Sequence, residues 1–291
     1  MANAKQQRLS KAEKKAAKEA AREAARKAER RRNRITGAVI AVLVLAGGGV
    51  IGFTLWQDAE EQAALEAELA AAEEEREQAA AEIEERIADR SVACGAQPPP
   101  GAGQEQEPFT ERPRDEDFDN AELYEARLAT SCGEIVLELH AFDAPETVEN
   151  FIALAEDGFL DGREIFRNAT SIEALQTGSG DDTAAWDAGY TIPDELRLAN
   201  AGGYPVGSVA MANPGVPDAA STQFFFVYGD TFDEAFADNR TYTRFADVIE
   251  GLDVLETIGA IGTLGDDPSL PGAEVPAEVV YLESVTIEVV S

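Results

Sequence analysis

The sequence predicts a mainly β domain, a closed antiparallel barrel capped by helices, which follows a transmembrane helix and a helical stalk. Residues 35–56 carry no charge, and residues 58–90 contain no Gly or Pro. After residue 122, short β-rich runs alternate with turn residues, and only two stretches have a helical pattern. Many strands with few helices favour an antiparallel barrel over a parallel α/β sheet.

Charge is divided unevenly along the chain. Residues 1–34 hold 13 Lys and Arg against 4 Asp and Glu, whereas the remainder holds 11 basic and 52 acidic side chains. Nucleic-acid affinity depends on basic residues that displace counterions, so we expect no nucleic-acid partner for the acidic body. His140, Cys94 and Cys132 are the only His and Cys residues. They are too few for a structural zinc site, and we expect neither a metal nor a cofactor.

The uncharged run from Ile35 to Trp56 is long enough to cross the roughly 30 Å core of a bilayer as a helix. A cleaved signal peptide is the alternative, but the basic and apolar regions are too long for one, and Trp56 suits a membrane interface. Basic residues precede the run and acidic residues follow it. The positive-inside rule then predicts a signal-anchor of the cell membrane, with residues 1–34 as a basic cytoplasmic arm and everything from Gln57 onward extracellular.

An acidic helical stalk is expected over residues 57–93. Six of its residues recur at alternating spacings of four and three, which is a weak heptad pattern. Its alanines and one arginine would pack poorly, so a monomeric stalk and a coiled-coil homodimer both stay open. The six residues are Leu65, Leu69, Ala72, Arg76, Ala79 and Ile83.

Residues 94–121 combine three consecutive prolines with Gly and acidic residues, which predicts an extended, unpacked linker. Cys94 begins this linker, and Cys132 falls at the tip of the first expected hairpin. In an exported chain an even number of cysteines usually means pairing. We therefore predict a Cys94–Cys132 disulfide, with two free thiols as the alternative, since the sequence does not show the distance between the Cα atoms.

The globular domain is expected over residues 122–291 and opens with a hairpin. Two alternating apolar runs meet at Cys132-Gly133, and the second places Ile135, Leu137 and Leu139 on one face. Later β-rich runs are GSVAMAN, TQFFFVYG, TYTRFADVIEG and VVYLESVTIEVV.

Two helices are expected in this domain. The first has Asp143 as its N-cap and Pro145 in its first turn, and it ends at Gly158. The second spans residues 251–261. The apolar stripe of the first helix consists of Val148, Phe151, Ile152 and Ala155.

Over residues 124–291 the order of motifs resembles a cyclophilin-type peptidyl-prolyl isomerase, in a membrane-anchored bacterial form. The motifs are "G-E-I-V-L-E-L", "A-P-E-T-V-E-N-F", "G-F-L-D-G", Gln176, "G-S-V-A-M-A-N-P-G", "T-Q-F-F-F" and "F-A-D-V-I-E-G-L-D-V". The resemblance implies an eight-stranded β-barrel closed by two helices, with a proline-binding groove on one face.

Isomerisation of an X–Pro bond has a barrier of about 18–20 kcal/mol, because amide resonance must be broken. A catalyst therefore needs a donor, typically Arg, aimed at the proline nitrogen, together with a dry apolar pocket and polar groups that hold the neighbouring carbonyl. This chemistry requires no nucleophile. A chain almost without His and Cys can supply it.

The resemblance implies a particular set of site residues. Where the family usually reads Phe-His-Arg, this chain reads Phe166-Arg167-Asn168, so an ungapped alignment puts Asn168 at the Arg position. In a strand, a one-residue offset turns a side chain to the opposite face, so Arg167 can serve only if the backbone bulges or the register shifts. We assign Arg167, Gln176 and Phe225 as catalytic, and Phe166, Ala212, Asn213, Gln223 and Tyr242 as substrate-binding.

Other positions also depart from the family pattern. The family's groove histidine aligns to Tyr242, and its next pocket aromatic and methionine align to Glu173 and Ala174. On this alignment we expect Arg167→Ala to abolish residual activity and Asn168→Arg to raise it.

Two functions follow from these residues. One is a membrane-tethered isomerase that assists the folding of exported or envelope proteins and acts on proline-containing polypeptides. The other is a catalytically weak or inactive module that binds proline peptides or serves as an envelope scaffold. The Asn168 alignment favours the module, and the retained Met-Ala-Asn and Gln-Phe-Phe motifs favour the isomerase.

Overall fold

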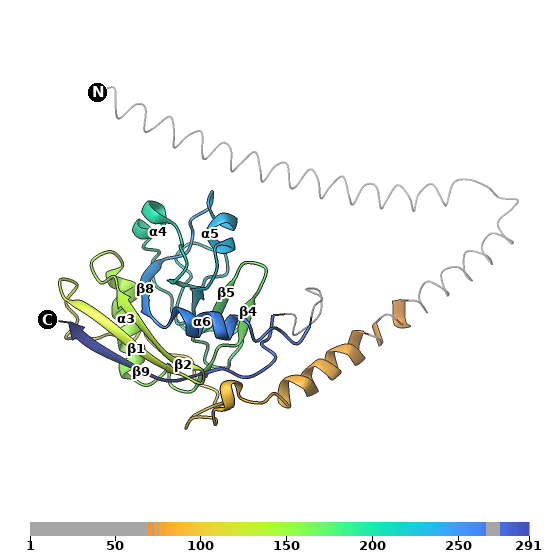
Figure 1. The fold of residues 1–291 in the computed structure, drawn as a ribbon. Helices are drawn as coiled ribbons and strands as arrows, with labels where there is room; N and C mark the ends of the chain where they lie inside the picture. The colour runs from red at the N-terminus through yellow and green to blue at the C-terminus, as the bar shows by residue number, and fades with distance from the viewer. Residues whose placement is uncertain (1–68, 72, 75, 266–273, 291) are drawn as a thin grey trace, which may run out of the picture. The chain divides into compact units, whose positions relative to one another are not determined.

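The computed structural model describes residues 69–71, 73–74, 76–265 and 274–290 (Figure 1). The expected basic arm (1–34), the expected transmembrane helix (35–56) and the first part of the stalk lie outside the described residues. No helix among the described residues is long and apolar enough to span a bilayer. The chain divides into two compact units, Met1–Glu74 and Glu75–Ser291, and all elements named below belong to the second.

One curled antiparallel sheet forms the described part of the domain (Figure 1). It has nine strands in the order β3-β9-β1-β2-β8-β6-β7-β5-β4. The strands are β1 (Leu123–Thr130), β2 (Gly133–Leu139), β3 (Arg163–Glu164), β4 (Arg167–Ala169), β5 (Ala174–Thr177), β6 (Ser208–Met211), β7 (Phe224–Val227), β8 (Arg244–Glu250) and β9 (Tyr281–Val290).

The count of nine strands corrects the expected eight. β3 and β4 are the two edges of the sheet, yet only Ile165 and Phe166 separate them in the chain. β3 pairs with β9 at one edge and β4 pairs with β5 at the other. Within the single segment 163–169, the first residues thus pair with β9 and the last with β5. This change of partner divides the segment into two strands.

The expected first hairpin is confirmed. Thr130 pairs with Gly133, so Ser131 and Cys132 form the turn between β1 and β2. Ile135, Leu137 and Leu139 are buried in the main hydrophobic core.

Four helices accompany the sheet: α3 (Pro145–Glu156), α4 (Arg197–Gly202), α5 (Thr231–Ala235) and α6 (Leu252–Gly259). The predicted stripe of α3 is buried in the main core, and α6 contributes Leu255 and Ile258 to the same core. The sequence pattern does not predict α4 or α5, because helices of six and five residues are too short to display a helical period.

The start of α3 differs from the expectation. The N-cap residue is Ala144, not Asp143, and its side chain makes no capping hydrogen bond. The carboxylate of Glu195 instead accepts hydrogen bonds from the backbone N–H groups of Glu146 (3.1 Å) and Thr147 (2.9 Å). The Glu195 carboxylate thus satisfies free amides at the N-terminus of α3. Its negative charge also interacts favourably with the positive end of the helix dipole.

Residues 97–119, here called the strap, are not the unpacked linker that their composition predicted. The Phe109 ring lies 5.2 Å from the Phe159 ring and 5.7 Å from the Tyr190 ring. Backbone N–H groups of the strap donate to the main domain, from Gln106 to Gly180 O (2.8 Å) and from Phe109 to Ala188 O (2.9 Å). One aromatic anchor and a few backbone bonds are enough to dock a segment that composition describes as extended.

Two arginines hold the strap from either side. Arg112, within the strap, forms salt bridges with Glu146 and Glu149 of α3. Arg163 is completely buried in β3, and its guanidinium donates to Gly180 O (3.1 Å) and to Gly101 O of the strap (3.3 Å). The strap is therefore bound to both α3 and the sheet.

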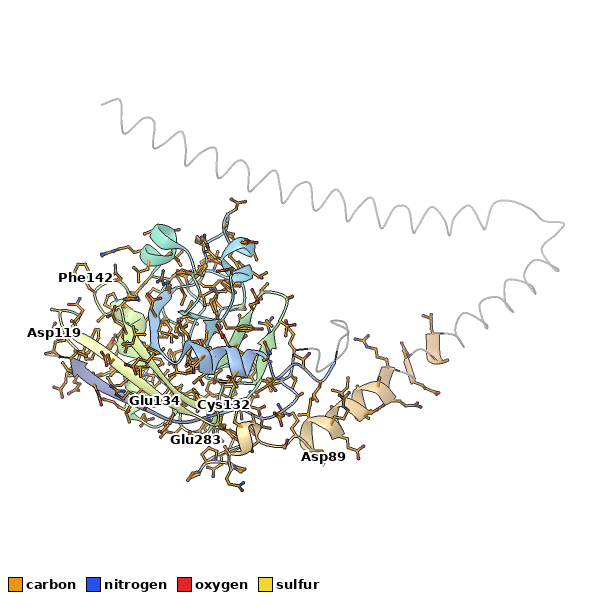
Figure 2. The ribbon with its side chains drawn as sticks, viewed as in Figure 1. Asp89, Asp119, Cys132, Glu134, Phe142 and Glu283 are labelled. Atoms are coloured by element: carbon orange, nitrogen blue, oxygen red, sulfur yellow. A yellow bond between two sulfur atoms is a disulfide. The ribbon has the colours of Figure 1, made fainter. Side chains whose placement is uncertain are left out.

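A disulfide joins Cys94 to Cys132, with their Cα atoms 5.2 Å apart. Cys94 lies in the 3-10 turn η1 (Ala93–Gly95), directly before the strap, and Cys132 lies in the β1–β2 turn (Figure 2). The bond ties the chain before the strap to the first hairpin.

The end of the stalk is helical over residues 76–88. Ile83, one of the six heptad residues, is only 7% exposed within a single chain. At this end of the heptad pattern the apolar side chain is thus already covered without a partner helix.

We predict that replacing both cysteines by serine lowers the free energy of unfolding by about 2–4 kcal/mol, because the bond constrains the unfolded chain across a separation of 38 residues. Chemical denaturation of both proteins measures the difference. Reductant should destabilise the wild type to the same extent and leave the double variant unchanged. Equal midpoints for the oxidised wild type and the double variant would contradict the prediction.

Candidate active site

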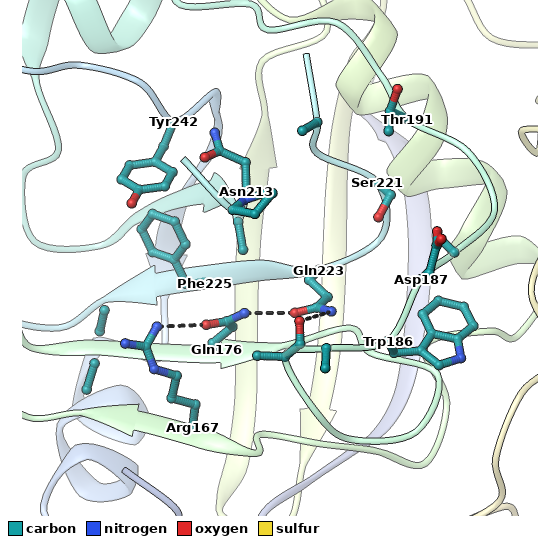
Figure 3. A pocket seen from close by; sticks show the side chains of 18 of the residues that line it. Arg167, Gln176, Trp186, Asp187, Thr191, Asn213, Ser221, Gln223, Phe225 and Tyr242 are labelled. Atoms are coloured by element: carbon teal, nitrogen blue, oxygen red, sulfur yellow. Dashed lines mark hydrogen bonds between the residues drawn. The ribbon is translucent and has the colours of Figure 1, made fainter. Parts of the chain in front are cut away.

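A cavity of about 490 Å³ lies over β4, β5 and β7 and beside the segment that follows β6. Its lining combines aromatic and small apolar side chains with the amides of Gln176, Asn213 and Gln223 (Figure 3). Among the described residues that line it, Arg167 is the only cation.

Strand register explains why these side chains share one face. Arg167 lies opposite Gln176, Gln176 opposite Phe225, and Phe225 opposite Ala210 across β4, β5, β7 and β6. Side chains of directly opposed residues project to the same face of a sheet. The neighbouring residues Leu175, Phe226 and Val209 form a parallel row on the other face, in the main core.

Asn168 belongs to the core-facing row, so its side chain does not enter the cavity. Asn168 is fully buried, donates through Nδ2 to Gly259 O (3.0 Å) and accepts from the Tyr228 hydroxyl (3.0 Å). The preceding residue, Arg167, therefore faces the cavity.

The loop between β4 and β5 contains Ile172 and Glu173, whose side chains point in different directions. Glu173 in this loop has a φ of 55°, a left-handed conformation that is uncommon outside glycine. Ile172 lines the cavity, whereas Glu173 points elsewhere and accepts a hydrogen bond from the Thr231 backbone N–H (2.9 Å). Hydrogen bonds from Thr231 lower the pKa of the Glu173 carboxyl. The carboxylate is thus kept out of the apolar pocket.

A chain of hydrogen bonds crosses the cavity floor (Figure 3). Arg167 donates through Nη1 to Gln176 Oε1 (3.0 Å), and Gln176 donates through Nε2 to Gln223 Oε1 (2.8 Å). Gln223 in turn approaches the carbonyls of Thr183 (3.4 Å) and Ala184 (3.5 Å). Because arginine only donates, it fixes the orientation of both amides in this chain.

One end of the cavity is aromatic. The Phe225 ring lies 4.8 Å from that of Phe232 and 5.3 Å, edge to face, from that of Tyr242. Burial raises the pKa of the Tyr242 phenol, although the charge of Arg167 opposes this shift. Tyr242 is therefore a neutral hydrogen-bond donor at pH 7. Nearby, Asn213 Nδ2 donates to Thr241 O (3.0 Å), which holds that side chain at the rim.

The other end of the cavity is a loop wall that sequence reasoning missed. It contains Trp186, Asp187 and Tyr190, from a segment without a recognisable motif. The Trp186 ring packs 5.7 Å from Phe159, which also contacts Phe109 of the strap. The strap is therefore linked to this wall through Phe159.

Most of the residues assigned from the sequence meet at this cavity. Phe166 does not line it, because it lies between β3 and β4 and is buried elsewhere. No three His, Cys, Asp or Glu side chains gather as a metal site in the described part of the chain. The assigned residues that line the cavity are Arg167, Gln176, Ala212, Asn213, Gln223, Phe225 and Tyr242.

The fold and the cavity define a β-sheet domain with a preformed apolar site and one guanidinium at its edge. The family model for cyclophilin type peptidyl-prolyl cis-trans isomerases matches residues 126–286, and the chain belongs to this family.

Relatives extend the comparison to individual proteins. Peptidyl-prolyl cis-trans isomerase 10 of Caenorhabditis elegans is 37% identical over 138 residues, which are 46% of this chain and 81% of that protein. Peptidyl-prolyl cis-trans isomerase cyp18 of Streptomyces antibioticus is 34% identical over 167 residues, 55% of this chain and 96% of that protein. A crystal structure of a Cryptosporidium parvum cyclophilin type isomerase has 21% identity and a TM-score of 0.47, and the match covers 57% of this chain and 98% of that one.

The buried position of Asn168 reverses the expectation that Asn168→Arg raises activity. We predict instead that this variant destabilises the domain by about 3 kcal/mol or more, because it buries an unpaired charge and leaves the Tyr228 hydroxyl without its acceptor. Chemical denaturation measures the loss. Thr170→Arg, which adds the same charge to an exposed loop position, is the matched control and should keep wild-type stability. Unchanged stability of Asn168→Arg would show that Asn168 does not face the core.

Proposed function

We propose that the domain catalyses cis–trans isomerisation of X–Pro bonds, with Arg167 as the donor to the proline nitrogen. The observation that carries this proposal is the guanidinium of Arg167, which is held beside Gln176 and Phe225 at the edge of an apolar cavity. Membership of the isomerase family supports it.

The site residues account for each requirement of the reaction. Phe225 and Tyr242 offer the proline ring an apolar surface. As the C–N bond twists, the proline nitrogen becomes pyramidal and basic, and an N–H of Arg167 stabilises it by a charge-assisted hydrogen bond. The amides of Gln176 and Asn213 are placed to hold the peptide carbonyls, so the bound bond is oriented before it rotates. No covalent bond forms or breaks, and no cofactor is involved.

The alternative is a module that binds proline peptides without accelerating isomerisation. The argument for it was the alignment of Asn168 with the family's arginine. The position of Arg167 at the cavity and of Asn168 in the core supports the isomerase over this module. The alternative now requires that Arg167 be unable to reach the peptide nitrogen.

We further propose that the chain is tethered to the cell membrane by residues 35–56 and assists the folding of exported or envelope proteins. The uncharged run and the opposite charges on its two sides support this topology. The Cys94–Cys132 disulfide supports an oxidising compartment for the domain, since such bonds are rare in reducing cytosol.

For catalysis, we predict that Arg167→Ala lowers kcat/KM in a protease-coupled proline-peptide assay by about 10²–10³, the usual cost of one transition-state donor. The control is Arg197→Ala, which removes a guanidinium whose side chain is 61% exposed and outside the cavity. Peptide binding is followed by the fluorescence of Trp186, which lines the cavity. Peptide binding by a wild type that does not accelerate isomerisation would favour the binding module.

For topology, we predict that protease added to intact spheroplasts removes the globular domain and spares residues 1–34. The reason is that the positively charged arm stays on the cytoplasmic side. Immunoblots with tags at each terminus report the outcome. A protected domain in intact spheroplasts, cleaved only after lysis, would reverse the proposed orientation.

A further inference from the structure

We propose that Glu274 is the positioning residue of Arg167, and that it holds the guanidinium in the orientation from which its remaining N–H groups face the cavity. This inference rests on the proposed isomerase function. Glu274 lies 107 residues after Arg167 and does not line the cavity itself.

The contact between the two side chains is bidentate. Arg167 donates through Nε to Glu274 Oε2 (2.7 Å) and through Nη2 to Glu274 Oε1 (3.2 Å). Two parallel N–H···O bonds to one carboxylate fix the plane of a guanidinium as well as its position. The hydrogen bond from Nη1 to Gln176 holds the third nitrogen of the guanidinium.

The donors of Arg167 can be counted. A guanidinium has five N–H groups, and three of them are donated to Glu274 and Gln176. Two N–H groups, on Nη1 and Nη2, remain for a bound peptide. Glu274 thus occupies the edge of the guanidinium formed by Nε and Nη2, and one N–H on each of Nη1 and Nη2 stays available.

The backbone holds Glu274 in register with Arg167. The carbonyl of Glu274 accepts a hydrogen bond from the Asn168 N–H (2.7 Å), so Glu274 lies along the outer edge of β4. The next residues are tied to the turn after α6, through Leu264 N–H to Val275 O (2.9 Å) and Ala277 N–H to Gly262 O (3.1 Å). The carboxylate is therefore presented by an anchored segment.

The exposure of the pair indicates a role in orientation and not in holding the fold. The side chains of Arg167 and Glu274 are 37% and 41% exposed, and exposed ion pairs contribute little to stability. A long arginine side chain held only by Gln176 would sample several rotamers. A donor that acts in the transition state must be oriented beforehand, so loss of Glu274 should reduce kcat while leaving peptide binding unchanged.

The test uses the full-length chain and the variant Glu274→Gln, which keeps the size of the side chain and removes its charge. We expect kcat to fall about fivefold, the rate factor that corresponds to about 1 kcal/mol for an exposed ion pair, with KM and thermal stability unchanged. The matched control Glu256→Gln removes an exposed carboxylate from α6 and should behave as wild type. In the Arg167→Ala background, Glu274→Gln should have no further effect.

A second measurement separates this inference from the proposed function. Phenylglyoxal modifies accessible arginines, and peptide mapping by mass spectrometry reports the rate at Arg167, with exposed Arg197 as the internal reference. We expect faster modification of Arg167 in Glu274→Gln than in the wild type or Glu256→Gln. If the wild type shows no isomerase activity but this difference is present, the proposed function fails and the ion pair stands. If Glu274→Gln has wild-type kcat, or lowers kcat equally with and without Arg167, the positioning role is overturned.

Discussion

The backbone pairing of β4 with β5 decides which side chain of the segment 166–168 faces the cavity. With Arg167 opposite Gln176, the guanidinium joins a row that continues through Phe225 to Ala210 across four strands. The same pairing sends Asn168 into the core, where Gly259 and Tyr228 complete its hydrogen bonds. A shift of one residue would exchange the two side chains and bury a charge, so the packing of the core and the chemistry of the site depend on one register.

The two ends of the cavity are built differently. The aromatic end belongs to the sheet, where Phe225 is flanked by the rings of Phe232 and Tyr242. The loop wall around Trp186 is instead held from behind by Phe159 and Phe109 and by the buried guanidinium of Arg163. Nearby, burial raises the pKa of the Glu164 carboxyl, although its salt bridge with Arg90 opposes the shift. Charged groups on this side of the domain serve to join segments, whereas Arg167 is directed into the cavity.

The parts of the structure that could be predicted from the sequence are those with local periodicity or a contiguous motif. The first hairpin, α3 and the groove residue Gln223 are of this kind. The orientation of Arg167 could not be predicted, because it depends on the register of β4 with β5, and a strand of three residues is too short to show a pattern that specifies its register. The role of Glu274 could not be predicted either, since it lies 107 residues away in a segment without a motif.

The strap has a consequence for where the folding unit begins. The family match starts at residue 126, whereas the compact unit starts at Glu75 and includes the strap, and Cys94 is bonded to the first hairpin. A fragment cut at the family boundary would lose Phe109, the disulfide and the Gly101 carbonyl that accepts from Arg163. Its sheet would keep Arg167 and Phe225, but the loop wall would lose the packing of Phe109 against Phe159. The buried guanidinium of Arg163 would lose one acceptor. The cavity therefore depends on residues outside the family match, and only the longer unit carries all the contacts that support its loop wall.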